Sequence, residues 1–202
     1  SIIRIGIPTA IDGRIERIVE NLAQVQPTFI AAVPRIFEKI YNKAVSGARE
    51  KSKTVYRLFK WSMEVGQEVS ALRQRGIEPQ GILRLKYSVA DRLVFKKMRN
   101  TFGGKVKFFI SGSAPLSPDI ATFFHASNLL ILEGYGLTES SAASFVNLPG
   151  KYRFGSVGLP LPGVEFKLAE DDNEVLLKSR GVMRGYYNLP DVTSDTLEDG
   201  WL

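Results

Sequence analysis

The chain has 202 residues, of which 44% are hydrophobic and 24% are charged, and its formal net charge is +6. This composition is ordinary for a folded globular domain and argues against intrinsic disorder. With no cysteine and a single histidine, the sequence excludes disulfides, zinc sites and Cys–His catalysis. No stretch approaches the roughly 18 consecutive apolar residues of a membrane-spanning helix. We therefore expect a cytoplasmic protein or one that binds at a membrane surface.

The first elements predicted along the chain are a helix, a strand and a second helix. Apolar residues recur at helical spacing between positions 15 and 22, with polar residues between them, as in an amphipathic helix. Residues 28–33 form a short apolar run that predicts a buried strand. Pro34 then suits the first position of a helix, where its missing N–H group removes no hydrogen bond.

Residues 39–104 form a basic helical region. From Lys39 to Lys107 there are 17 Lys and Arg against 5 Asp and Glu, whereas the rest of the chain is net acidic. Apolar residues keep helical spacing across residues 51–75 and 82–100, and a loop with Gly and Pro separates the two runs. The pattern predicts a basic helical hairpin that packs on an α/β core.

Aromatic residues in this region have two possible uses. Tyr56, Phe59 and Trp61 could enter lipid headgroups beside the lysines, or they could pack against the core. Their helical spacing favours packing. The single histidine, His125, lies in an apolar helical segment, where we expect a helix-surface or partly buried residue and not a catalytic base.

Two predicted strands are each followed by a glycine-containing loop. Residues 105–110 lead into Ser111-Gly112-Ser113-Ala114-Pro115, and a helix is expected from Pro118. Residues 129–132 lead into the octapeptide Glu133-Gly134-Tyr135-Gly136-Leu137-Thr138-Glu139-Ser140. Open parallel sheets bind ligands at the carboxyl edge of their strands. We expect both strands in one parallel sheet, with the two loops enclosing a planar ligand.

The octapeptide contains the groups that a nucleotide site needs. Gly134 and Gly136 would let the backbone turn sharply and approach a flat ligand, and the Tyr135 ring could stack on a purine. Thr138 and Glu139 offer oxygen ligands for Mg²⁺ and phosphate. The alternative is a glycine turn after a core strand, with Tyr135 packed inward and Glu139 capping a helix.

The octapeptide resembles the core motif of the adenylate-forming enzymes, a superfamily of acyl-CoA synthetases, luciferases and peptide-synthetase adenylation domains. Three further stretches resemble motifs of that superfamily in the same order: residues 111–116, 181–188 and 199–202. Residues 27–37 and the basic helical region more narrowly resemble the long-chain fatty acid–CoA ligases. The resemblance implies that a carboxylate attacks the α-phosphorus of ATP, pyrophosphate leaves, and coenzyme A captures the acyl-adenylate.

The resemblance also implies a role for each site residue. Tyr135 would stack on adenine, Thr138 would meet the α-phosphate, and Glu139 would hold Mg²⁺, so that Thr138 and Glu139 are the candidate catalytic residues. The cofactor-binding set that the resemblance implies consists of Gly112, Ser113, Ala114, Pro115, Glu133, Gly134, Tyr135, Gly136 and Thr138. Gly136 would open onto the acyl tunnel.

Other parts of the family pattern are missing: the serine- and threonine-rich phosphate loop, the ribose-binding aspartate, the hinge and the lysine of the C-terminal domain. We therefore interpret the chain as an incomplete fragment of a larger α/β domain. Residues 1–147 would form a parallel sheet flanked by helices, and residues 148–202 a β-rich segment with a hairpin around Asp171-Asp172-Asn173. Alone, the fragment should be inactive and should self-associate through uncovered sheet edges.

The basic region leaves several partners open. It could be a solvated helical face, or it could meet an anionic lipid surface or the phosphates of coenzyme A. Nucleic acid is not expected, because no recognised nucleic-acid module accompanies the charge. Two other functions are also open: an acyl-AMP ligase that delivers to a carrier protein, and a basic module that binds membrane surfaces.

Overall fold

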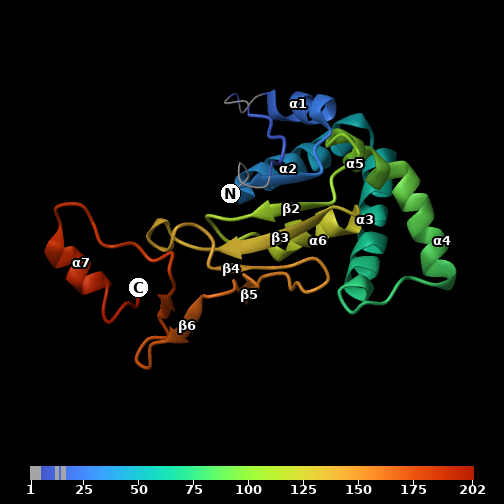
Figure 1. The fold of residues 1–202 in the computed structure, drawn as a ribbon. Helices are drawn as coiled ribbons and strands as arrows, with labels where there is room; N and C mark the ends of the chain where they lie inside the picture. Colours follow the sequence, from blue (N-terminus) through green and yellow to red (C-terminus); the bar gives the residue numbers. More distant parts are fainter. Residues whose placement is uncertain (1–5, 12–13, 15–16) are drawn as a thin grey trace. The chain divides into compact units, whose positions relative to one another are not determined.

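The computed structural model describes residues 6–11, 14 and 17–202. It is a mixed α/β structure with a mostly parallel sheet flanked by helices (Figure 1). The helices are α1 (Ile18–Val25), α2 (Pro34–Lys51), α3 (Lys53–Arg73), α4 (Gly81–Ala90), α5 (Lys96–Thr101), α6 (Pro118–Ala126) and α7 (Pro190–Thr196). The strands are β1 (Phe29–Ala32), β2 (Phe108–Ser111), β3 (Leu130–Tyr135), β4 (Phe145–Val146), β5 (Leu159–Pro160), β6 (Glu165–Leu168) and β7 (Val175–Lys178).

The chain divides into two compact units. The first comprises Ser1–Ile30, Val45–Phe109 and Phe123–Leu130, and the second comprises Ala31–Ala44, Ile110–Thr122 and Ile131–Leu202. The basic hairpin belongs to the first unit and both predicted ligand loops belong to the second. The predicted boundary between residues 147 and 148 stays a prediction.

Local sequence signals account for the starts of the long helices. α2 begins at Pro34, as predicted, and it buries Phe37 and Ile40. α3 begins after Ser52, whose hydroxyl accepts a hydrogen bond from the N–H of Val55 at 3.1 Å. The helix predicted over residues 15–22 is described from Ile18 onward as α1, and residues 15 and 16 lie outside the described part of the chain.

The predicted helical hairpin is confirmed in the first unit, where α3 and α4 pack together. Their shared core contains Val65, Val69, Tyr87, Ala90, Phe95 and Ala126. Residues 82–100 were expected to form one regular helix, but a π-helical turn, η2 (Asp91–Phe95), separates α4 from α5. The turn places Phe95 fully in the core, next to the ring of Tyr87 at 5.7 Å between centroids. Periodicity alone cannot reveal such a one-residue insertion.

Phe59 and Trp61 of α3 serve packing, as their helical spacing predicted, whereas the Tyr56 hydroxyl accepts a hydrogen bond from Arg49 at 3.0 Å. Phe59 is buried with its ring 6.2 Å from that of Phe123, and Trp61 packs against the core of the first unit. His125 is more deeply buried than expected, since only 7% of it is exposed. Its Nδ1 lies 2.8 Å from the Ser70 hydroxyl, and burial lowers its pKa to about 4, so the ring stays neutral at physiological pH.

The five-stranded sheet has the order β1-β2-β3-β4-β5. β2 and β3 are neighbours and their arrows point the same way, as predicted for one parallel sheet (Figure 1). β4 then pairs antiparallel with β3, and β5 antiparallel with β4. These two-residue strands were not predicted, because two residues are too short to show an alternating pattern.

The rest of the second unit contains the predicted hairpin. β6 and β7 pair antiparallel, with Leu168 opposite Val175, and Asn173 in the connecting turn has a positive φ of 62°. α7 was not expected in this β-rich segment. Among the described residues, no helix combines the length and the hydrophobicity needed to span a bilayer.

Candidate active site

The two glycine-containing loops meet at one edge of the sheet. Gly112 directly follows β2, and Gly134 lies near the end of the neighbouring strand β3. A Cβ atom on Gly112 would lie 3.5 Å from the carbonyl oxygen of Gly134, so the two backbones pass within van der Waals contact. Ser113 adopts a positive φ of 70° and, like Ala114 and Pro115, is exposed. The expected juxtaposition of the two loops is therefore present.

The glycines of the octapeptide serve close packing and not a sharp turn. β3 continues through Tyr135, and Gly134 and Tyr135 pair with Val146 and Phe145 of β4. A Cβ atom on Gly136 would lie 1.6 Å from the carbonyl oxygen of Ala142. The expectation that Gly134 and Gly136 turn the chain is wrong, because Gly134 lies within β3 and Gly136 follows that strand without a turn.

The chain turns a few residues later, around Ser140. The segment η3 (Thr138–Ser140) is a short 3₁₀ turn, followed by positive φ angles of 60° at Ser141 and 95° at Ala142. The buried hydroxyl of Ser140 accepts a hydrogen bond from the N–H of Leu137 at 3.0 Å. This bond closes the turn and fixes the backbone that carries Thr138 and Glu139, the two residues expected to meet phosphate and metal.

Tyr135 is half-buried, and its ring lies 6.0 Å from that of Phe145 at an angle of 54°. The contact holds the ring against β4 without enclosing it. Both predicted uses of Tyr135, inward packing and stacking on a planar ligand, are compatible with this position. Its role in adenine binding stays a prediction.

Glu133 has a structural contact that its sequence position did not reveal. The side chain is buried, with 7% exposed, and its carboxylate accepts hydrogen bonds from the N–H of Leu116 at 3.1 Å and of Gly155 at 3.3 Å. Bonds from backbone N–H groups to a carboxylate are stronger than bonds between neutral groups. Glu133 thus ties the loop after β2 and the loop after β4 to strand β3.

The predicted metal ligand Glu139 is held by a segment far away in the sequence. Tyr186 donates a hydrogen bond from its hydroxyl to Glu139 Oε1 at 2.9 Å, and the N–H of Met183 donates to the Glu139 carbonyl oxygen at 2.7 Å. Ser141 adds a hydrogen bond from its hydroxyl to the Gly181 carbonyl oxygen at 2.6 Å. Residues 181–186 therefore lie directly against the octapeptide.

The electrostatics of this contact favour an ionised carboxylate. The pKa of Glu139 lies below its ordinary value, first because its own backbone N–H donates to the side chain and second because the Tyr186 hydroxyl does. The pKa of the Tyr186 hydroxyl is raised correspondingly by the same bond. Sequence reasoning recognised the 181–188 motif but did not single out Tyr186. The only sequence feature that pointed to Tyr186 was its place in the 181–188 motif.

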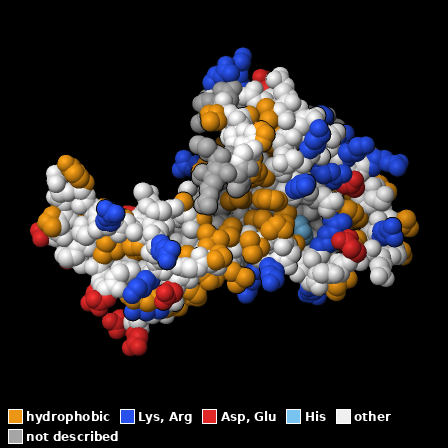
Figure 2. Space-filling model, viewed as in Figure 1, with side chains coloured by type: hydrophobic (Ala, Val, Ile, Leu, Met, Phe, Trp, Pro, Cys, Tyr) orange, Lys and Arg blue, Asp and Glu red, His pale blue; other side chains and the backbone are white. Residues whose placement is uncertain are grey.

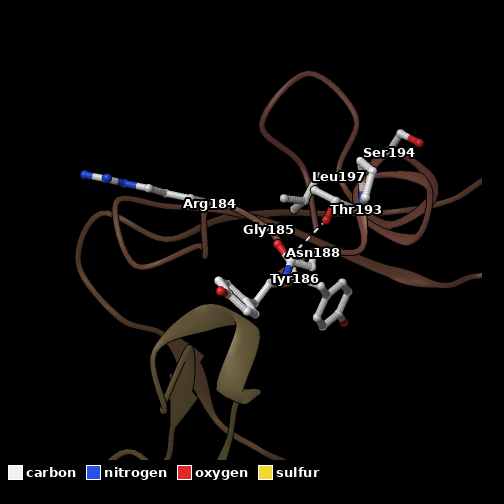
Figure 3. Close-up of a pocket in the computed structure, with 9 residues that line it drawn as sticks. Arg184, Gly185, Tyr186, Asn188, Thr193, Ser194 and Leu197 are labelled. Atoms are coloured by element: carbon white, nitrogen blue, oxygen red, sulfur yellow. Dashed lines mark hydrogen bonds between the residues drawn. The ribbon is translucent and has the colours of Figure 1, made fainter.

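An open surface pocket of about 490 Å³ is lined by Tyr186, its neighbours in residues 184–190 and α7 (Figure 3). Thr193 of α7 accepts a hydrogen bond from the N–H of Tyr186 at 2.9 Å. Gly185 has a φ of 146°, and a Cβ atom there would lie 2.7 Å from Thr193 Cγ2. The Arg184 side chain points away from Thr193 and Leu197 in Figure 3. α7 thus braces the segment that holds Glu139.

The described residues contain no cluster of three or more His, Asp or Glu side chains that could hold a metal ion. Mg²⁺ commonly binds through one or two carboxylates together with substrate phosphates. Glu139, kept ionised on an ordered turn at a ligand edge of the sheet, suits that role.

The family model for AMP-binding enzymes matches residues 3–187. The long-chain-fatty-acid–CoA ligase FadD15 of Mycobacterium bovis is 36% identical over 93% of the chain, which spans 30% of that ligase. The long-chain-fatty-acid–CoA ligase ACSBG2 of Xenopus laevis is 34% identical over 90% of the chain, which spans 25% of it. The chain therefore spans less than a third of the length of these curated relatives.

Solved structures show the same fold. An anthranilate CoA ligase, AuaEII, in complex with anthranoyl-AMP matches 95% of the chain with a TM-score of 0.57 and 18% identity, and the match covers 30% of that structure. The N-terminal domain of FACL13 from Mycobacterium tuberculosis, bound to an inhibitor, matches 93% of the chain with a TM-score of 0.58 and 18% identity. The match covers 36% of the FACL13 domain.

Proposed function

The chain belongs to the AMP-binding enzyme family, and from this we propose that it acts as the central segment of a long-chain fatty acid–CoA ligase. The observation that carries the proposal is the 34–36% identity to long-chain ligases across at least 90% of the chain. The proposed reaction has two steps. The fatty acid carboxylate attacks the α-phosphorus of ATP and pyrophosphate leaves, and the thiol of coenzyme A then attacks the acyl carbonyl and AMP leaves.

The adenine side of the site is assigned to the meeting loops at the ends of β2 and β3. Residues 112–115 and Gly134 would line the base, and Tyr135 would stack on it. The close approach of Gly112 to the Gly134 carbonyl supports this assignment, since it brings the two loops together at one edge of the sheet with no side chain on either glycine. Fixing the base fixes the ribose and thus the α-phosphorus at which the carboxylate attacks.

Thr138 and Glu139 are assigned to the phosphate end. The Thr138 side chain is exposed on the 3₁₀ turn and would donate its hydroxyl to the α-phosphate. Glu139 would hold Mg²⁺, with Tyr186 keeping its carboxylate ionised and oriented. When bound, Mg²⁺ supplies charge neutralisation as the carboxylate approaches the polyphosphate.

We propose that other parts of a longer protein complete the site, because the chain spans only 30% of a relative such as FadD15. These parts would supply the phosphate loop, the ribose carboxylate and a catalytic lysine. The triphosphate makes most of the charge-assisted hydrogen bonds in such a site. The 202-residue chain alone should therefore bind ATP or AMP weakly and form no acyl-adenylate.

A pyrophosphate-release assay with a series of fatty acids tests the proposal. It is run on the complete protein that contains these residues and on the 202-residue chain, with coenzyme A or an acyl carrier protein as acceptor. We expect turnover only by the complete protein, with long-chain acids and coenzyme A. Transfer to the carrier protein alone would point to an acyl-AMP ligase, and no turnover with any fatty acid would overturn the assignment.

We also propose that the isolated chain self-associates. On the β6–β7 hairpin, Phe166 and Leu168 are 50% and 54% exposed, and a two-stranded sheet presents open edges to a second copy. Sedimentation velocity over a concentration series tests this. A monomer at every concentration would contradict it.

A further inference from the structure

The outer face of α4 and of the turn that follows carries apolar side chains that are exposed and do not belong to the described core cluster. Ile82, Leu85, Val89 and Leu93 recur every three or four residues and are 74%, 69%, 50% and 39% exposed. The opposite side of the same helix is buried in the core of the first unit. Within the described chain, these four residues form an apolar stripe on a helix that is already anchored from behind.

The surroundings of this apolar stripe are cationic. Asp91 is the only acidic residue between positions 79 and 118. Its carboxylate accepts two hydrogen bonds from the Arg99 guanidinium, at 2.6 and 2.8 Å, so its charge is compensated. The exposed cations on α4, η2 and α5 are Arg84, Lys86, Arg92, Lys96 and Lys97. Figure 2 shows Lys and Arg side chains, with hydrophobic ones between them, over the region where Figure 1 labels α4.

We propose that the apolar stripe and its flanking cations bind the surface of an anionic lipid bilayer. A bilayer offers both chemistries at once, with an apolar boundary for the four aliphatic side chains and negative headgroups for the lysines and arginines. A second copy of the chain suits this face less well, because pairing it with itself brings two cationic surfaces together. The surface is distinct from the aromatic residues of α3, since Phe59 is buried and Trp61 packs on the core.

Co-sedimentation of the 202-residue chain with lipid vesicles tests the proposal. Vesicles of phosphatidylglycerol and phosphatidylcholine are compared with vesicles of phosphatidylcholine alone. We expect binding to the anionic vesicles that weakens as salt rises, because the Debye length falls from about 10 Å at 0.1 M to about 3 Å at 1 M. No nucleotide or fatty acid is added, so the result is independent of the proposed ligase activity.

Two sets of variants identify the surface. Leu85→Ser should lower binding, whereas Leu148→Ser, an apolar residue 44% exposed elsewhere, should not. The double variant Lys86→Gln/Arg92→Gln should lower the partition coefficient by about five-fold for each cation removed, or about 25-fold in all. Its control, Lys151→Gln/Arg180→Gln, removes the same charge from the second unit and should bind within about two-fold of the wild type. Circular dichroism checks that each variant is folded.

Several outcomes would overturn the proposal. These are wild-type chain that stays in the supernatant, equal binding to neutral vesicles, and equal losses in the variants and their controls. Sedimentation velocity without lipid tests whether a second copy of the chain binds the α4 face instead. A dimer that Leu85→Ser dissociates would assign the α4 face to self-association and not to a bilayer.

Discussion

The Tyr186 hydroxyl donates a hydrogen bond to Glu139 Oε1 at 2.9 Å, which joins two motifs 47 residues apart in the sequence. The N–H of Met183 holds the backbone carbonyl of Glu139 at the same time. Both the side chain and the backbone of Glu139 are thus oriented by one segment, which Thr193 of α7 braces from behind. Loss of a partner that orients a metal ligand typically costs about 10- to 100-fold in metal affinity.

Tyr186→Phe should weaken Mg²⁺ use by the complete protein. Without the hydroxyl, Glu139 loses one of the two hydrogen bonds that lower its pKa, so that pKa moves up toward its ordinary value. The carboxylate then becomes protonated at a higher pH, and the acidic limb of the rate profile should shift upward. We also expect the Mg²⁺ concentration for half-maximal rate to rise on the order of ten-fold. The measurement is the pyrophosphate-release rate against pH and Mg²⁺.

Tyr187→Phe is the matched control for Tyr186→Phe. Tyr187 is the next residue and is 91% exposed, so loss of its hydroxyl should change neither the Mg²⁺ requirement nor the pH profile. Equal effects of the two variants would contradict a specific role for the bond to Glu139.

Glu139→Gln should reduce the rate of adenylation more than the affinity for the fatty acid. A neutral amide is a poorer Mg²⁺ ligand than a carboxylate, although it has nearly the same shape. Single-turnover measurement of acyl-adenylate, with Mg²⁺ varied, separates the rate from binding. If Glu139→Gln and the wild type had the same rate at every Mg²⁺ concentration, Glu139 would be a structural residue of the 3₁₀ turn.

Tyr135→Ala should weaken ATP use by about 1–3 kcal/mol, the usual contribution of stacking between a base and an aromatic ring. Tyr135→Phe keeps the ring and should stay close to the wild type. The measurement is the Michaelis constant for ATP, together with the turnover number. An unchanged constant in Tyr135→Ala would leave the ring with its packing role against Phe145 alone.

The elements that the sequence predicted well have local signals. Pro34 starts α2, and Asn173 turns the β6–β7 hairpin with a positive φ of 62°. Each of these residues restricts or frees the backbone by itself, so one sequence is enough to find it.

The geometry of the candidate site depends on contacts between distant residues, which no local sequence pattern predicts. Tyr186 reaches Glu139 only because β3 and the segment after β7 fold together, and spacing along the chain does not encode that pairing. Gly136 was recognised, but for the wrong reason, because the atom it must avoid is the carbonyl oxygen of Ala142. The hydrogen bonds that Glu133 accepts from the N–H groups of Leu116 and Gly155 could not be predicted from the sequence either.

Glu133→Gln should destabilise the fold by about 2 kcal/mol, because Leu116 and Gly155 donate their N–H groups to different oxygens of the buried carboxylate, and an amide keeps only one of these oxygens. The amide nitrogen would face an N–H group of Leu116 or Gly155. Urea unfolding of the 202-residue chain measures the change. Glu165→Gln, at an exposed position of β6, is the control and should stay within about 0.5 kcal/mol of the wild type. Equal stabilities of the two variants would show that Glu133 does not secure the loops.

Gly136→Ala should lower the free energy of unfolding by about 3 kcal/mol or more. The new Cβ would overlap the Ala142 carbonyl oxygen at 1.6 Å and lie 2.7 Å from Ala143 Cα, and backbone atoms, unlike a flexible side chain, cannot swing aside. Gly47→Ala is the matched control, since Gly47 lies in α2 with nothing within 4 Å of its added Cβ.

Because alanine favours a helix over glycine, Gly47→Ala should stabilise the chain by up to about 1 kcal/mol. The two substitutions add the same methyl group. If urea unfolding shows a lower free energy of unfolding for Gly136→Ala and a higher one for Gly47→Ala, the loss comes from close backbone packing and not from a general effect of replacing glycine. A stable Gly136→Ala chain that keeps the wild-type unfolding midpoint would mean that the backbone around Ala142 moves freely. The turn could then not hold Thr138 and Glu139 in one fixed position, and the phosphate end of the proposed site would have to be assigned elsewhere.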